Sequence, residues 1–281
     1  MRCRTSVGLP LDLPRNIIPE SDSANSNVSS SLIALVILLI LFCSAMFGMQ
    51  VGRNLPKHHL NDQTKGVIAV STGVIGTLTA LVLGLLIGAA SNSFNTKNRE
   101  VVLMAADMIQ ADHLLRRYGP EAEDSRDLLH RYIAMKIQDF FPEGKNDRPN
   151  LSNPSTGALL EELEDRLVAL NASNANQRWL QSQAVQLVNN IGTARWLLVE
   201  QSTNGVSVPL LVMVVFWLCL LFFTNPLFAP RNATVITALF ICAVAAAGAI
   251  DMMLELNTPF RGFIRISSQP MKQALDQISL K

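Results

Sequence analysis

Four long apolar stretches dominate the hydrophobic pattern of this chain. They cover Ser31–Gly52, Gly66–Thr96, Gln201–Pro230 and Asn232–Ile250, and none of the four contains Asp, Glu, Lys or Arg. A helix of about 20 mostly apolar residues crosses the roughly 30 Å hydrocarbon core of a bilayer. Backbone polar groups in lipid must bond within their own segment, so each stretch is predicted to be a helix and not a buried strand. The pattern therefore predicts an all-α integral membrane protein with four transmembrane helices.

The segment between the second and third stretches has a helical but more polar pattern. Leu159, Leu163 and Leu167 recur at the spacing of an amphipathic helix. Gly119–Pro120 and the Pro- and Asn-rich residues 142–155 divide the segment into several helices. The helix that leaves the second span is expected to continue into this segment, because no Gly or Pro interrupts it there. We predict a helical cytosolic insertion stacked directly beneath the membrane helices.

These assignments divide the chain into five regions. They are a disordered cytosolic tail (1–30), transmembrane helices one and two (31–90), a cytosolic helical domain (91–205), transmembrane helices three and four (206–256) and a cytosolic C-terminal tail (257–281). Of the 23 Lys and Arg residues, 19 lie on the side of the two tails and the central segment, and four lie on the other side. Lys and Arg favour the cytoplasmic side of a membrane, so both termini are expected to be cytoplasmic.

Composition excludes several functional classes. Hydrophobic residues make up 49% of the chain, charged residues 16%, and the net charge is +1, so there is no basic field for nucleic acid. The chain has no Gly-rich phosphate loop, no His-Glu-x-x-His, no Gly-x-Ser-x-Gly and no Cys pair of zinc-site spacing. We expect neither an enzyme nor a bound cofactor or metal. Membrane lipid is the partner that the pattern requires.

Small residues recur at every fourth position along the second span. They are Thr72, Gly76, Ala80, Gly84 and Gly88. Glycine lowers helix stability, so a row of small residues indicates a specific use. One use is close packing against another helix, and the other is a pore lining that leaves room for an ion. Asn92 and Asn95 follow at the predicted cytoplasmic mouth, where neutral polar groups suit an ion that sheds part of its water.

A polar cluster follows the fourth span. It consists of two carboxylates one helical turn apart and the turn after them: Asp251, Glu255, Pro259, Phe260, Arg261 and Gly262. Carboxylates inside a membrane point to function by default, but these two lie beyond the charge-free run, where water reaches them. Two interpretations stay open. The carboxylates pair with Arg261, Arg265 or nearby helix N-termini in a structural role, or they take part in ion coordination or gating.

The residues from Glu255 to Ser267, with Pro270 and Leu275 beyond them, resemble the signature Glu-Leu-x-x-Pro-Phe-x-Gly-x-Ile-x-Val-Ser. That signature follows the last span in a bacterial family of bestrophin-like membrane proteins. A looser match runs from Leu83 to Asp112, and the resemblance covers roughly residues 31–278. It implies four membrane helices, a helical cytosolic part, the inner membrane of a bacterial cell, and a homo-oligomer that is a pentamer as in bestrophins.

The resemblance leads us to expect a bestrophin-like ion channel that conducts an inorganic anion, with the second span lining the pore. Two features depart from bestrophins. Their pore neck carries bulky apolar side chains, whereas this row is Gly and Ala, and their calcium-clasping acidic run is represented here by Asp251 and Glu255 alone. The alternative function is a non-conducting membrane scaffold or signal transducer whose cytosolic domain binds a partner. In that case the small-residue row would pack helices within one chain.

Overall fold

The computed structural model describes residues 30–54, 62–142, 149–203 and 208–279. Within these ranges the chain forms eight α-helices, two short 3-10 helices and no strand. The α-helices are α1 (Ser30–Asn54), α2 (Asp62–Tyr118), α3 (Glu123–Phe140), α4 (Pro154–Ala169), α5 (Ala175–Thr203), α6 (Val208–Thr224), α7 (Ala233–Asn257) and α8 (Gln269–Ser279). The 3-10 helices are η2 (Pro120–Ala122) and η3 (Asn225–Phe228). The predicted N-terminal tail, apart from Ser30, lies outside the described residues.

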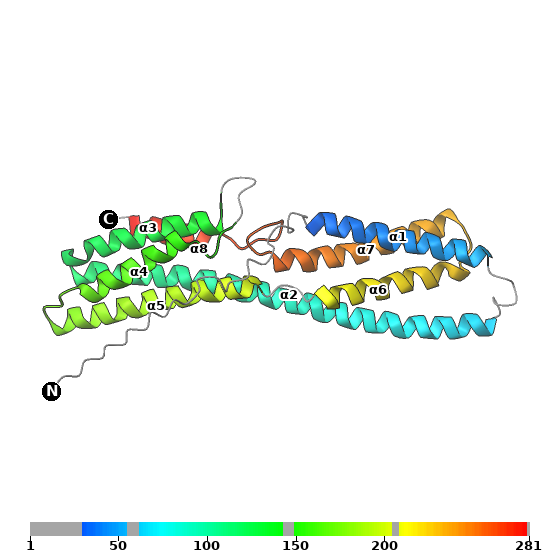
Figure 1. Ribbon diagram of the computed structural model, residues 1–281, viewed down its shortest axis with the longest axis horizontal. Helices are drawn as coiled ribbons and strands as arrows, with labels where there is room; N and C mark the ends of the chain where they lie inside the picture. Colours follow the sequence, from blue (N-terminus) through cyan, green and yellow to red (C-terminus); the bar gives the residue numbers. More distant parts are fainter. Residues whose placement is uncertain (1–29, 55–61, 143–148, 204–207, 280–281) are drawn as a thin grey trace, which may run out of the picture.

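The helices form two bundles that lie end to end in an elongated molecule (Figure 1). We call the first the membrane bundle; it contains α1, α6, α7 and the N-terminal half of α2. We call the second the extramembrane bundle; it contains the C-terminal half of α2 with α3, α4, α5 and α8. The predicted stacking of a helical insertion against the membrane helices is therefore present in the structure.

Helix α2 joins the two bundles. It has 57 residues, which corresponds to a length of about 85 Å at 1.5 Å per residue. Its continuation to Tyr118 confirms the prediction that the second span extends beyond the membrane. Gly119 follows with φ 127°, a conformation that residues with a Cβ avoid, and the chain turns back through η2 into α3.

Helices α1, α2, α6 and α7 are each long and apolar enough to cross a membrane, and they coincide with the four predicted spans. Large apolar side chains cover their outer surface; Leu85 on α2 is 66% exposed and Phe47 on α1 is 63% exposed. Water-soluble proteins rarely expose continuous apolar surface of this kind, whereas lipid tails solvate it. The protein is an integral membrane protein.

Two glycines of α1 allow it to approach the corner between α6 and η3 at backbone distance. A Cβ built on Gly48 would overlap the carbonyl oxygen of Phe223, and one built on Gly52 would overlap that of Leu227. One turn earlier, the Ser44 hydroxyl donates a hydrogen bond of 2.9 Å to the Cys219 carbonyl oxygen. This is small-x-x-x-small packing. It was not predicted from the sequence.

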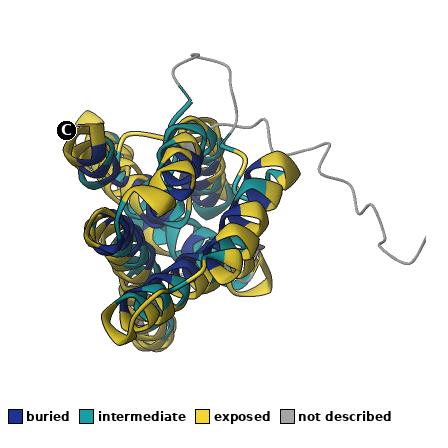
Figure 2. Ribbon diagram, turned by 90° about the vertical axis from the view of Figure 1, so that its left-hand side faces the viewer, coloured by how far each residue is buried: buried dark blue, intermediate teal, exposed yellow. Residues whose placement is uncertain are grey.

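The extramembrane bundle has a continuous apolar core, and the ribbon segments of its buried residues face the inside of the bundle (Figure 2). Met104 and Met108 of α2 and Leu129 of α3 are fully buried in it. Helix α8 lies against α2 and α3, and its buried residues Met271, Ala274 and Ile278 recur at helical spacing. The sequence-based division treated residues 257–281 as a tail, and the structure places a core helix there.

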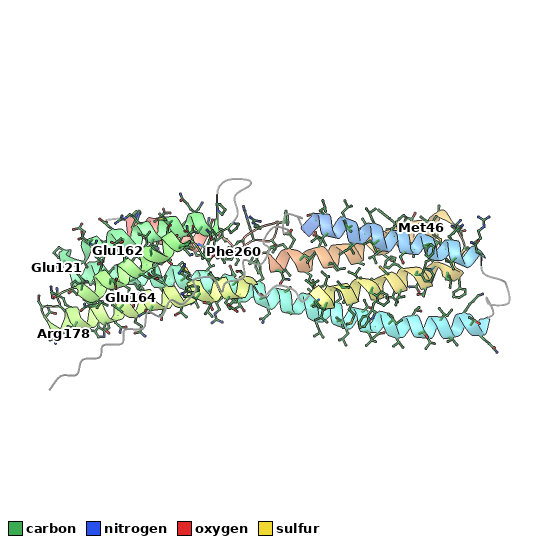
Figure 3. All side chains as sticks on the ribbon, viewed as in Figure 1. Met46, Glu121, Glu162, Glu164, Arg178 and Phe260 are labelled. Carbon is green, nitrogen blue, oxygen red and sulfur yellow. The ribbon has the colours of Figure 1, made fainter. Side chains whose placement is uncertain are left out.

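Charged side chains occur at the far end of the extramembrane bundle (Figure 3). The labelled residues Glu121, Glu162, Glu164 and Arg178 all lie in the part of the extramembrane bundle farthest from the membrane helices, whereas Met46 lies in the membrane bundle. Phe260 lies between the two bundles, at the place where the chain leaves α7. This junction and the membrane half of α2 contain all the site residues predicted from the sequence.

Candidate functional site

The C-terminal part of the small-residue row in α2 faces no other helix in the described part of the chain. Ala80, Gly84 and Gly88 are exposed. A Cβ built on Gly84 or on Gly88 would have nothing within 4 Å. The opposite side of α2 makes the contacts with the bundle; there Leu83 and Leu86 pack against the apolar core.

The N-terminal part of the row is half-buried. A Cβ on Gly76 would lie 3.9 Å from the nearest side-chain atom of Leu221 on α6, which is ordinary van der Waals contact. The Thr72 hydroxyl donates to the Ile68 carbonyl oxygen of its own helix at 2.8 Å. Neither residue brings the backbone of another helix close to α2. The close backbone approach in this bundle occurs at Gly48 and Gly52 instead.

The two asparagines predicted at the pore mouth are exposed on α2. Asn92 follows Gly84 and Gly88 at the same four-residue spacing, so it lies on nearly the same side of the helix. Its carbonyl oxygen accepts a 2.9 Å hydrogen bond from the Thr96 hydroxyl. The open face of α2, defined as Ala80, Gly84, Gly88 and Asn92, is thus small, uncharged and polar at one end.

At the end of α7, Glu255 closes the turn that follows. Glu255 is only 8% exposed. Its Oε2 accepts hydrogen bonds from the backbone N–H groups of Phe263 at 2.7 Å and Ile264 at 3.4 Å. Gly262 has φ 81°, and a Cβ there would overlap Glu255 Oε2. Hydrogen bonds to a charged acceptor are stronger than neutral ones. The Glu255 carboxylate therefore holds the turn, and only glycine fits beside it.

The same turn connects the membrane bundle to the end of α3. The Ile266 N–H donates to the Pro259 carbonyl oxygen at 2.8 Å, and the Arg261 N–H donates to the Thr258 carbonyl oxygen at 3.0 Å. The Phe260 ring lies with its centroid 5.2 Å from that of Phe140 and 6.0 Å from that of Phe141. Aromatic contacts at these separations are favourable. The segment 259–266 is therefore a fixed connection between α7 and α3.

Asp251, one turn before Glu255, is half-buried, and its Oδ1 has no hydrogen-bond partner in the described part of the chain. The structural role expected for these carboxylates, pairing with Arg261, Arg265 or nearby helix N-termini, stays a prediction. In the described part of the chain both arginines are exposed and no ion pair joins them to either carboxylate. The backbone amides at 263 and 264 take that place for Glu255.

Comparison with known proteins agrees with this junction and with the arrangement of the helices. The family model described as Bestrophin-like domain matches residues 30–271. The chain belongs to the Bestrophin-like family. The match includes all four membrane helices and the Glu255–Gly262 turn. No curated protein matches this Bestrophin-like chain by sequence.

Solved structures share the fold of this Bestrophin-like protein. A variant of a bacterial bestrophin homologue from Klebsiella pneumoniae superposes with a TM-score of 0.62 at 11% sequence identity, over 87% of this chain and 97% of that chain. A second variant of the Klebsiella homologue gives 0.61 at 12% identity, over 87% and 98%. A crystal structure described as a membrane protein gives 0.60 at 11% identity, over 88% and 99%. Identities this low establish the fold alone.

Sequence reasoning missed a buried cation in the extramembrane bundle of this Bestrophin-like protein. Lys136 of α3 is fully buried. Its Nζ donates to the Leu151 carbonyl oxygen at 3.1 Å and lies 4.5 Å from the centroid of the Phe140 ring. Burial lowers the pKa of Lys136 to about 8, against the opposing effect of the nearby Asp139 carboxylate. The sequence signal that could have indicated this buried cation is the position of Lys136 among the apolar residues of α3.

Asp139 joins the end of α3 to the start of α4. Its two carboxylate oxygens accept hydrogen bonds from Asn153 Nδ2 at 2.7 Å and from the Thr156 hydroxyl at 2.5 Å. Asn153 is also the N-cap of α4, since its side-chain oxygen accepts from the Ser155 N–H at 3.1 Å. Arg195 of α5 donates to the Asn153 carbonyl oxygen at 3.3 Å. These contacts hold three helices together and have the character of structural, not catalytic, bonds.

Proposed function

We propose that this Bestrophin-like protein is an oligomeric ion channel that conducts anions through a pore lined by α2. The open face of α2 carries the proposal, because a Cβ built on Gly84 or Gly88 meets nothing within 4 Å in the described part of the chain. A glycine row that packed helices within one chain, as the scaffold alternative requires, would lie in contact with another helix. Family membership and the fold shared with a bacterial bestrophin homologue support the channel class.

The chemistry of the open face suits a weakly held ion. Small side chains leave space along an axis surrounded by several copies of α2, and uncharged groups do not trap an ion that must leave again. The side-chain amides of Asn92 and Asn95 supply N–H donors at one end. Donors of this kind replace part of the hydration shell of an anion. The amide group as a whole has no net charge, so the site stays electrically neutral.

Assembly into a homo-oligomer is supported by apolar side chains exposed where lipid does not reach. On the extramembrane bundle Trp196 is 63% exposed, Leu103 48% and Val102 43%. A second copy of the chain would remove this surface from water. Mass measurement of the detergent-purified protein, with Leu103→Glu as the disrupting variant, tests this step. A monomeric mass for the unmodified chain contradicts it, and five copies are expected.

We place the extramembrane bundle and both termini in the cytoplasm, on the basis of the Lys and Arg distribution. The bundle is then within reach of a protease in inverted membrane vesicles and protected in intact spheroplasts. Cleavage between α3 and α4 by protease added outside spheroplasts would contradict this orientation. The distribution of charges predicts protection there.

Current through planar bilayers tests conduction directly. Gly84→Phe places a large ring on the open face and is expected to lower or abolish the current, and Asn92→Asp adds a negative charge and is expected to lower the permeability ratio of anions to cations. Leu39→Phe is the matched control, because Leu39 of α1 is 55% exposed on the apolar surface of the bundle. Silence in both anion and cation solutions, from an assembly of intact mass, would favour the scaffold.

Cysteine accessibility gives a second measurement that does not need current. In a background without Cys3, Cys43, Cys219 and Cys242, the Gly84→Cys variant is expected to react with a charged thiol reagent because water fills a pore. A cysteine at Ala243, which is fully buried between the membrane helices, is expected to stay protected. Equal protection at both positions would argue against an aqueous path along α2.

A further inference from the structure

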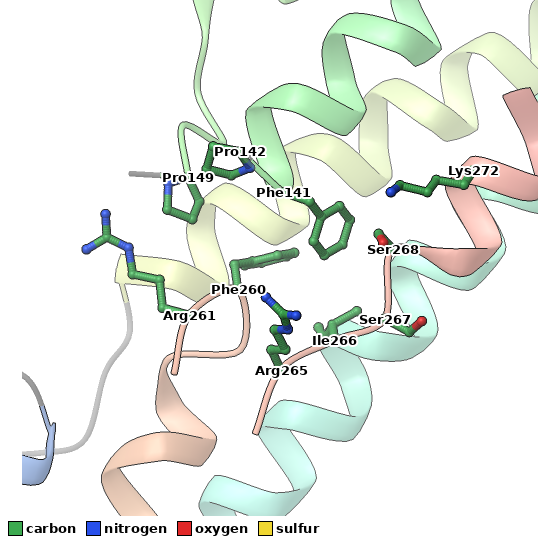
Figure 4. A pocket seen from close by; sticks show the side chains of 10 residues that line it. All are labelled: Phe141, Pro142, Pro149, Phe260, Arg261, Arg265, Ile266, Ser267, Ser268 and Lys272. Carbon is green, nitrogen blue, oxygen red and sulfur yellow. The ribbon is translucent and has the colours of Figure 1, made fainter. Parts of the chain in front are cut away.

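A basic cavity lies at the junction of the two bundles (Figure 4). It has a volume of about 600 Å³ and lies between the end of α3 and the segment that leads from α7 into α8. Three cationic side chains line it: Arg261 and Arg265 from the segment after α7, and Lys272 from the first turn of α8. The hydroxyl residues Ser267 and Ser268 lie between them in the sequence and also line the cavity.

The positive charge of this cavity is not neutralised by the described part of the chain. No carboxylate is among its lining residues. Arg261, Arg265 and Lys272 are exposed and form no ion pair with a described residue, and this includes Asp276, one turn after Lys272 on α8. Residues 143–148, outside the described ranges, contain two acidic and two basic residues and so add no net charge. Positive charges that line one cavity attract an anion to it.

The cavity is also held in a fixed shape. Arg261 and Arg265 lie on the turn that Glu255 fastens through the amides of Phe263 and Ile264. Phe260, in the same turn, forms one wall and packs on the aromatic rings at the end of α3. A preformed site does not spend binding free energy on ordering its backbone. Two arginines are thus attached to a fixed backbone segment, and guanidinium groups match the planar pairs of oxygens on phosphate.

The position of the cavity matches the level of lipid headgroups. Arg261 lies four residues after the end of α7, the last membrane helix, and Lys272 lies three residues into α8. Basic pockets directly beyond membrane helices bind the headgroups of anionic lipids. The aromatic and proline side chains of the cavity wall, Phe141, Phe260, Pro142 and Pro149, provide apolar surface for the non-phosphate part of a ligand.

We propose that this cavity binds the phosphate group of an anionic ligand, either a phospholipid headgroup or a soluble phosphate compound, through Arg261, Arg265 and Lys272. The site is separate from the open face of α2, and the proposal does not require the protein to conduct. Its chemistry is that of a regulatory or positioning site, because none of its described lining residues is a His, Asp or Glu that could act as a general base to Ser267 or Ser268.

Two binding measurements on the full-length, detergent-purified assembly test the proposal. The first is native mass spectrometry after incubation with phosphatidylglycerol or with zwitterionic phosphatidylcholine. The second is calorimetric titration with inorganic pyrophosphate. The protein is expected to retain phosphatidylglycerol in preference to phosphatidylcholine, to bind pyrophosphate, or to do both; the first result identifies a lipid headgroup as the ligand source, and pyrophosphate binding alone identifies a soluble one.

Variants connect the binding to the cavity. Arg265→Gln and Lys272→Gln each remove one charge-assisted contact and are expected to weaken binding about tenfold. Arg178→Gln is the matched control; it makes the same change of charge on an exposed residue at the far end of the extramembrane bundle (Figure 3). Because all three residues are exposed, the melting temperature should not change. Failure to bind in both measurements overturns the proposal, and so does an equal loss in Arg178→Gln.

Discussion

Replacing Gly262 with alanine is expected to destabilise the junction strongly. At φ 81° the residue has the left-handed conformation, which costs a residue with a Cβ about 1–2 kcal/mol. The new Cβ would also overlap Glu255 Oε2, so the carboxylate must leave the amides of Phe263 and Ile264. Hydrogen bonds to a charged group contribute about 1.5–3 kcal/mol to stability. The two effects together predict a loss of about 3–5 kcal/mol in the free energy of unfolding.

Thermal unfolding of the detergent-purified protein, followed by tryptophan fluorescence, measures this loss. A change of this size should lower the melting temperature by about 10 °C. Glu255→Gln keeps an oxygen acceptor but removes the charge, and it should give a smaller decrease than Gly262→Ala.

Gly84→Ala is the control for the substitution itself. Gly84 lies within α2 with no atom within 4 Å of a built Cβ, and alanine is favoured over glycine inside a helix by about 1 kcal/mol. Its melting temperature should equal or exceed that of the unmodified protein. The assigned role of the Glu255–Gly262 contact is refuted if Gly262→Ala melts with the unmodified protein, or if Gly84→Ala falls as far.

Three further outcomes follow from the packing. Gly48→Ala should lower the melting temperature, since its Cβ overlaps the Phe223 carbonyl oxygen and overpacking costs about 1–3 kcal/mol. Phe260→Ala should cost about 2–3 kcal/mol in denaturant unfolding, because it removes a ring from the aromatic cluster. Burial lowers the pKa of Lys136 to about 8 in the folded protein, from an ordinary value of 10.5. The unfolded chain then binds more protons between these values, so thermal stability should rise from pH 8 to pH 10.5, and Lys136→Met should remove that rise.

The membrane helices could be predicted because one physical requirement decides them. A charge-free apolar run of about 20 residues has a single stable form in lipid, and the four runs of this chain meet that condition. The extension of α2 was also predictable, since no Gly or Pro occurs between Gly88 and Tyr118. In both cases the deciding interactions are local to one segment.

The packing partners could not be predicted, because they depend on residues far apart in the chain. Gly48 and Gly52 have the same four-residue spacing as Gly84 and Gly88, but only the α1 pair lies against another helix. Spacing identifies a small-residue face and does not identify what lies opposite. Helix α8 was missed for a related reason, since its 11 residues are too few for a stable helix without the surface that α2 and α3 provide.

The residues of the specific signature after the last span and the residues that carry the proposed function are different sets. Glu255, Phe260 and Gly262 fasten the turn between α7 and α3 through an amide-bound carboxylate, an aromatic contact and a left-handed backbone. A conducting and a non-conducting protein of this fold would need that turn equally, so the signature reports the fold and not ion passage. The conduction that we propose would depend instead on Gly84 and Gly88, where the described part of the chain leaves the helix surface open. Substitutions at the turn should therefore change stability first, and substitutions on α2 should change current at unchanged stability.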